Sequence, residues 1–232
     1  MAGCTLSERW SKHLEFYIHT VTFLVRVTLL PAATSSLALT QVEDCLFRVP
    51  REPLEAESTV FRDMFLLPQG DSETVEGQSD TSPVILHGVS KKEFESLLRA
   101  LLNRQHGKQK GSRLGKTQWI SVLKLSTMWE FNELRDAAIQ HLDSPSQPLD
   151  PVNKLVLASK YQIKKWQLPA LLEFAKRSEL ISVEEGRLIG FENALKLAAV
   201  REQFQKMKLL DVIDKEKESR TCTSLVRKAF DL

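Results

Sequence analysis

The stretch VEDCLFRVPREPLEAESTVFRDMF, from Val42 to Phe65, changes its apolar period midway and so predicts a strand followed by helices. Cys45, Phe47 and Val49 alternate with their neighbours and share one face of the predicted strand. Pro50 has no N–H to donate to a sheet ladder, and we expect the strand to end there. Because a small thiol suits an apolar strand face, the cysteine is predicted to be a core residue rather than a reactive one.

Two short helices are predicted after this corner. Pro53 fits the first turn of a helix with the sequence PLEAE, and Ser58 is a suitable N-cap for the helix that follows. The second helix carries an apolar stripe at helical spacing, which predicts core packing: Val60, Phe61, Met64 and Phe65.

Two other segments supply partner strands. The downstream one is the short apolar run PVILHGV. The upstream one, YIHTVTFLV, alternates between one face with Val21, Phe23 and Val25 and another with Ile18, Thr20, Thr22 and Leu24. Its β-branched and aromatic residues favour a strand, although a signal peptide with PAATSSLA as its cleavage region is an alternative. The apolar run is too short, and too interrupted by His19 and Arg26, to predict a membrane span.

Helices are predicted for most of the remaining chain. Ser90 and Glu93 form a capping box, S-x-x-E, ahead of an apolar helical face, and Ser182 and Glu185 repeat that spacing. The face expected after the second box consists of Phe191, Ala194, Leu195 and Ala198. From Lys206 onward the density of charge predicts a frayed helix and a tail.

Composition indicates a globular chain without a strong electrostatic partner. The chain has 232 residues, 42% hydrophobic and 27% charged, and a net charge of +2, which gives no reason to expect nucleic acid as a partner. Cys4, Cys45 and Cys222 are far apart and lack metal-ligand spacing, so neither a disulfide framework nor a zinc site is predicted. An intracellular, reducing location fits this cysteine content, without distinguishing cytoplasm from nucleus.

No motif in the sequence predicts catalysis. GSRLGKT, Gly111 to Thr117, is one residue short of a phosphate-binding loop, and no strand is predicted to lead into it. The basic stretch from Arg104 to Lys116 contains no aromatic residue for base stacking and is typical of a solvated loop. The histidines show no metal-ligand spacing: His13, His19, His87, His106 and His141. We therefore predict no enzyme activity, cofactor or metal, with an enzyme of unmarked site as the alternative.

The order of these segments resembles the BTB/POZ domain, in the form common in mushroom-forming fungi (basidiomycetes). That family has a strand pair, a helix pair with an L-x-x-x-S-x-x-F signature, a third strand and further helices. Here the signature falls on Leu54, Ser58 and Phe61, with Phe65 following, and WISVLKLSTMWEFNELRDAAIQHL resembles the later helix pair. The resemblance implies an α+β fold: a BTB/POZ-like small sheet with surrounding helices, followed by an all-α C-terminal extension.

The resemblance also implies a division of the chain. It predicts an N-terminal segment (1–15), a BTB/POZ-like domain (16–143), a helical extension (150–205) and a charged tail (206–232). The segment 26–41 interrupts the first strand pair and lacks a clear period. We interpret it as an insertion or a retained short intron, or alternatively as a natural long hairpin loop, and we expect it to add nothing to the core.

By the same resemblance, the function is non-enzymatic protein–protein association. The partner is expected to be a second copy of the chain or another BTB protein; alternatives are a substrate adaptor that binds a cullin scaffold of a ubiquitin ligase, and a transcription-associated regulator. The family dimer uses the N-terminal helix and the adjoining sheet edge, which points to Phe16, Val21, Phe23 and Val25.

Two departures from the family limit what the resemblance implies. Most members have an Asp before the first strand, where this chain has Thr20, and a His or an Arg-like residue after the second, where it has Pro50. Those family residues line a charged pocket near the dimer centre, so that pocket is not implied here.

Overall fold

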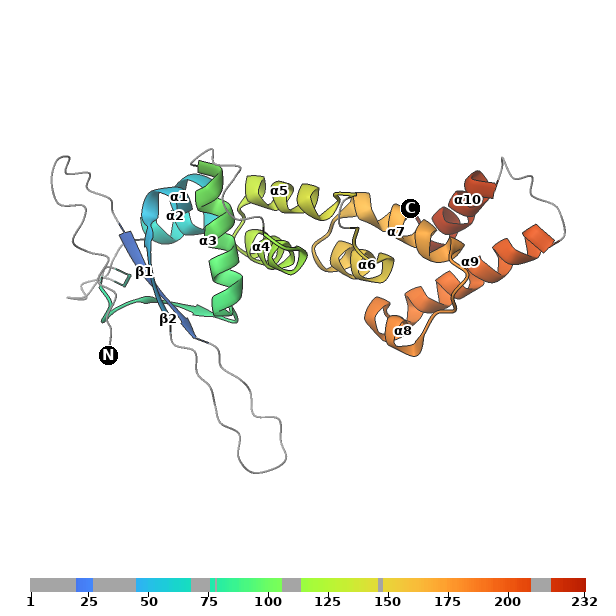
Figure 1. Cartoon of the computed structure of the whole chain (residues 1–232), viewed down its shortest axis with the longest axis horizontal. Coiled ribbons are helices and arrows are strands. Elements are labelled where there is room, and N and C mark those ends of the chain that lie inside the picture. Colours follow the sequence, from blue (N-terminus) through green and yellow to red (C-terminus); the bar gives the residue numbers. More distant parts are fainter. Residues whose placement is uncertain are drawn as a thin grey trace, which may run out of the picture. The chain divides into compact units, whose positions relative to one another are not determined.

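The computed structural model describes residues 20–26, 45–67, 76–77, 79–105, 114–145, 148–209 and 218–232. These ranges contain three strands and ten helices, which confirms the predicted α+β class (Figure 1). The chain divides into two compact units, Met1–Ala138 and Ile139–Leu232. The division falls inside helix α5 (Asn132–Leu142), a few residues before the end of the domain predicted over 16–143.

Unit 1 is built on a sheet with the strand order β2-β1-β3. The strands are β1 (Thr20–Arg26), β2 (Cys45–Pro50) and β3 (Val84–His87). β1 pairs antiparallel with β2 and parallel with β3, so it is the central strand. The predicted strand end at Pro50 is confirmed. Of the segment 26–41, the structure describes Arg26 alone, as the last residue of β1; the rest lies outside the described residues.

One face of the sheet contacts the helices α2 (Thr59–Leu66) and α3 (Lys91–Gln105), and α1 (Arg51–Glu57) packs against α2. At the centre of this core, Phe23 of β1 meets Phe61 of α2 and Phe94 of α3 edge-on, each at 5.6 Å between ring centroids. Trp129 closes the cluster against Phe61 at 5.2 Å. Edge-to-face aromatic pairs each add about 0.5–1.5 kcal/mol beyond the area they bury, so this cluster stabilises the joint between sheet and helices.

The capping box at the start of α3 is confirmed. The N–H of Ser90 donates to Glu93 at 2.9 Å, and the N–H of Glu93 donates to the Ser90 hydroxyl at 3.3 Å. Lys124, on α4 (Lys116–Met128), donates to the other oxygen of Glu93 at 2.7 Å. Burial alone would raise the pKa of Glu93, but these hydrogen bonds outweigh it and lower the pKa, so the carboxylate links α3 to α4.

Unit 2 is helical throughout its described residues. Its helices beyond α5 are α6 (Pro151–Lys160), α7 (Lys164–Lys176), α8 (Val183–Ile189), α9 (Phe191–Leu209) and α10 (Glu218–Phe230). Asp150 caps α6 as predicted, accepting from the N–H groups of Val152 and Asn153 at 3.1 and 3.2 Å. The core includes fully buried side chains from α7, α9 and α10: Ala170, Phe174, Leu197, Cys222 and Val226. Among the described helices, none combines the length and the apolar character needed to cross a membrane.

Two sequence predictions for unit 2 are wrong. The chain does not become a frayed tail from Lys206: α9 continues to Leu209, and α10 packs against α7 and α9. The apolar face expected from Phe191 is not the buried one, since Phe191 is 79% exposed. Gly190, with a φ of +88°, separates α8 from α9. The residues of α9 that are buried in the core are Leu197, Val200, Arg201 and Phe204.

Candidate interaction surface

The outer face of the sheet carries a row of apolar residues in direct cross-strand register. Leu24 on β1 lies opposite Leu46 on β2 and opposite Ile85 on β3. Side chains alternate along a strand, so these three point away from the face that holds Phe23. We call Leu46, Leu24 and Ile85 the apolar row.

The apolar row is accessible at both ends. Leu46 is 47% exposed and Ile85 is 37% exposed, while Leu24 between them is half-buried. The row stops at Thr22, the next outward residue of β1, which is 2% exposed and whose N–H donates to the carbonyl of Gly77 at 2.7 Å. An apolar stripe across three adjacent strands is a surface that excludes water well when another protein covers it.

A pair of opposite charges lies beside the row. Arg48, two residues beyond Leu46 on the same face of β2, donates to Asp80 at 2.9 Å. The two side chains are 61% and 58% exposed, and an ion pair this exposed contributes little to folding. Both groups therefore remain available to a partner at small cost to the unit itself.

Within the described residues, the outer strands have unpaired backbone edges. Across the ranges that the structure describes, β2 and β3 each pair with β1 and with no other strand. An unpaired edge presents N–H and C=O groups that can extend the sheet into a second chain. The row and the two edges together form one candidate surface for association.

The interaction residues predicted from the sequence are not on this surface. Val21, Phe23 and Val25 were expected at a free strand edge, and that expectation is wrong because β3 returns to pair with β1 and makes it the central strand. The three side chains are 4%, 0% and 0% exposed and belong to the core. Phe16 lies outside the described residues.

Sequence alternation contained the signal for the apolar row. Leu24 falls on the opposite face from Phe23, and Leu46 on the opposite face from Phe47, so both outward faces carry an apolar residue where solvent normally selects a polar one. The sequence alone does not reveal the cross-strand register, which places Leu24 directly opposite Leu46 and Ile85.

The signature residues have structural roles. Leu54, Ser58 and Phe61 are 0%, 0% and 2% exposed, and Phe65 is half-buried with the Arg51 guanidinium 4.4 Å from its ring centroid. Ser58 caps α2 as predicted, its hydroxyl oxygen accepting from the N–H of Phe61 at 3.1 Å. Phe61 packs against Phe23 of β1 and so joins α2 to the sheet whose strands carry the apolar row.

The residues considered for chemistry remain scattered. Within the described ranges, no three His, Cys, Asp or Glu side chains are grouped closely enough to hold a metal ion. Burial raises the pKa of the Cys222 thiol and so favours its protonated form. The near-match to a phosphate loop follows helix α3 rather than a strand, and α4 begins inside it at Lys116. The predictions of no enzyme activity and no cofactor remain predictions.

The chain was also compared with known proteins. No family model, curated protein or solved structure matches it.

Proposed function

We propose that unit 1 is a protein–protein interaction domain of the BTB/POZ type and that it associates with a second copy of the chain through the apolar row. The observation that carries the proposal is the alignment of Leu46, Leu24 and Ile85 across the accessible face of the sheet. Isolated apolar side chains are common on protein surfaces, but a row in register over every strand of a sheet is a continuous contact surface.

The order of elements supports the BTB/POZ assignment. A strand pair, β1 and β2, is followed by the helix pair α1 and α2, then by β3 and α3. The L-x-x-x-S-x-x-F signature spans this helix pair, and its residues Leu54, Ser58 and Phe61 are buried. The sequence resemblance rests on the same order.

Charge complementarity favours a second copy of the chain as the occupant. A two-fold axis brings the same patch of both subunits together, so each residue meets its counterpart in reverse. Such an axis through the apolar row allows Arg48 of one subunit to approach Asp80 of the other, while the rows cover each other. A surface that carries both charges beside an apolar centre complements itself.

The association is expected to be weak and concentration-dependent. Burying a whole Leu or Ile side chain is worth about 1.5–3 kcal/mol, and Leu46 and Ile85 are already about half-buried. That gain must exceed the loss of translational and rotational freedom, so we expect roughly micromolar affinity.

Hydrogen exchange of the full chain at low and high micromolar concentration tests this proposal and locates the contact. We expect amides of β2 and β3 to exchange more slowly at high concentration, while those of α2, on the other side of the sheet, are unchanged. Equal exchange of β2 and β3 at both concentrations would rule out the sheet as the contact, and slowing confined to unit 2 would assign association to another surface.

A further inference from the structure

Helix α10 presents a polar, basic face opposite its packed one. Cys222 and Val226 are fully buried against the unit 2 core, whereas Arg220, Ser224 and Arg227 are exposed. Because the apolar side is already covered by α7 and α9, this helix cannot insert that side into a bilayer. The exposed side of α10 is therefore a polar, basic surface.

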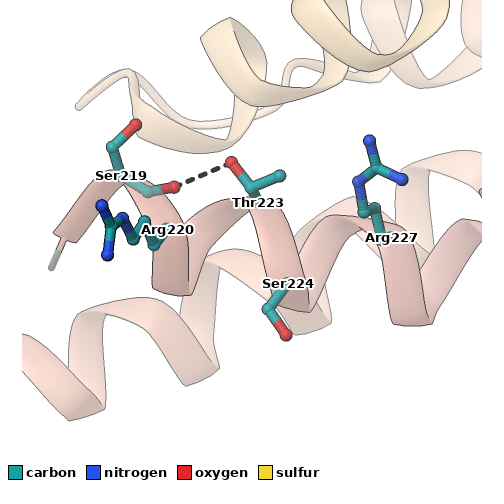
Figure 2. Close-up of a pocket in the computed structure, with 5 residues that line it drawn as sticks. All are labelled: Ser219, Arg220, Thr223, Ser224 and Arg227. Atoms are coloured by element: carbon teal, nitrogen blue, oxygen red, sulfur yellow. Dashed lines mark hydrogen bonds between the residues drawn. The ribbon is translucent and has the colours of Figure 1, made fainter.

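Two arginines form the centre of this face. Arg220 and Arg227 are seven positions apart, nearly two full turns, so they lie in one stripe separated by about 10.5 Å along the axis. Thr223 and Ser224 lie on opposite sides of the stripe, and with Ser219 these residues line a shallow hollow (Figure 2).

The hollow is rich in hydrogen-bond donors. The Thr223 hydroxyl donates to the Ser219 carbonyl at 2.8 Å and is occupied (Figure 2). The Ser219 hydroxyl oxygen accepts from Lys176 at 3.1 Å, which leaves its own O–H able to donate. The side chains of Ser224, Arg220 and Arg227 make no hydrogen bond or ion pair with any residue that the structure describes.

Among the described residues, no carboxylate pairs with a side chain of the hollow. None of its lining residues is acidic. Glu218, at the start of α10, forms an ion pair with Lys208 of α9. Two arginine forks with hydroxyl donors beside them match the needs of phosphate, which arginine binds through two parallel hydrogen bonds.

We propose that the α10 face binds an extended peptide segment bearing two phosphorylated side chains three positions apart. In an extended polyproline II chain, which has three residues per turn and rises about 3.1 Å per residue, side chains three positions apart share one face and lie about 9 Å apart, close to the spacing of the two arginines. One phosphate contacts Arg220 with Ser219 or Ser224, and the other contacts Arg227. This site lies within unit 2 and does not depend on the apolar row.

Fluorescence polarisation with the full chain tests this directly. The probe is a labelled peptide of Gly, Ala and Ser with two phosphoserines three positions apart, and the matched control carries unmodified serines. We expect Arg220→Gln and Arg227→Gln each to weaken binding roughly tenfold or more, since each removes a charge-assisted contact. Arg187→Gln, at an exposed arginine of α8, is the control variant and should leave affinity within about twofold.

Four results would overturn the proposal. They are no binding of the phosphopeptide, equal binding of the unmodified peptide, and equal losses in Arg187→Gln and the α10 variants. The fourth is tight binding to vesicles with anionic phospholipid that the phosphopeptide does not displace, which would assign the face to a membrane surface. Inorganic phosphate at millimolar concentration should compete with the peptide and so separates phosphate recognition from general charge attraction.

Discussion

The hydroxyl of Ser58 donates a 2.6 Å hydrogen bond to the backbone carbonyl of Trp129, 71 residues further along the chain. The same oxygen accepts the N–H of Phe61 and so caps α2. One buried hydroxyl thus starts a helix and ties it to the end of α4, next to the aromatic cluster. In this chain, the hydroxyl at position 58 therefore has both roles.

Ser58→Ala is expected to destabilise unit 1 by about 2–4 kcal/mol. The variant loses an N-cap, worth about 1 kcal/mol, and leaves a buried carbonyl without this donor, at about 1–3 kcal/mol. Urea unfolding followed by circular dichroism measures the change. Ser121→Ala is the matched control, because Ser121 donates to the Thr117 carbonyl within its own helix and should be nearly neutral. Equal losses of unfolding free energy in both variants would show that the hydrogen bond from Ser58 to Trp129 does not stabilise the fold.

Alanine substitutions at Gly77 and Gly88 distinguish the cost of backbone strain from the cost of steric contact. Both have positive φ, +86° and +72°. A Cβ at Gly77 would lie 2.9 Å from a Val21 methyl and 3.0 Å from a Val84 methyl, whereas a Cβ at Gly88 meets nothing within 4 Å. We therefore expect Gly88→Ala to cost about 1 kcal/mol and Gly77→Ala about 1–3 kcal/mol more. Similar unfolding midpoints for the two variants would contradict the close packing of Gly77 on the sheet.

The Arg177–Glu185 pair predicts a stability change in acid. Hydrogen bonds from Arg177, at 2.7 and 2.5 Å, and from the Ser182 N–H hold the pKa of Glu185 at about 2, below its ordinary 4.5. Because the folded state favours the ionised carboxylate, its contribution is complete above about pH 4.5 and is lost as the pH falls toward 2. Glu185→Gln should cost about 1–3 kcal/mol at neutral pH and progressively less in acid.

Thermal unfolding between pH 2 and pH 7 measures this difference. Glu184→Gln is the control: it removes the neighbouring exposed carboxylate and should run parallel to the wild type at every pH. A gap between wild type and Glu185→Gln that stays constant down to pH 2 would show that Glu185 titrates normally.

Helix starts were the best-predicted features, because capping is a local interaction. The cap at Ser58, the boxes at Ser90 and Ser182 and the cap at Asp150 all depend on residues within three positions of one another. The strand end at Pro50 is local in the same sense. Each was therefore correct from sequence alone.

Strand order could not be predicted, because it depends on contacts distant in sequence. The alternation of Val21, Phe23 and Val25 identifies a strand with one apolar face, but not whether it is central or at an edge. The parallel return of β3 settles that, and it involves residues about sixty positions away. The candidate surface is therefore the apolar row across all three strands and not an edge of β1.

The packing of α9 and α10 was missed for a different reason. α9 carries apolar residues on several sides, so period alone does not select Leu197 and Phe204 over Phe191. α10 is rich in charge, and its two fully buried residues, Cys222 and Val226, are too few to stand out in the sequence.

Light scattering on the purified full chain across a micromolar concentration series tests the central claim most directly. The account predicts that the average molar mass of the wild type rises with concentration. The variant Leu46→Lys/Ile85→Lys places charge at both ends of the apolar row and should keep the mass of a monomer throughout. Leu66→Lys/Leu67→Lys is the matched control, since those leucines are 72% and 65% exposed in the same unit but away from the row, and it should associate like the wild type. A wild type that stays monomeric throughout, or a row variant that associates as well as the control, would contradict the account.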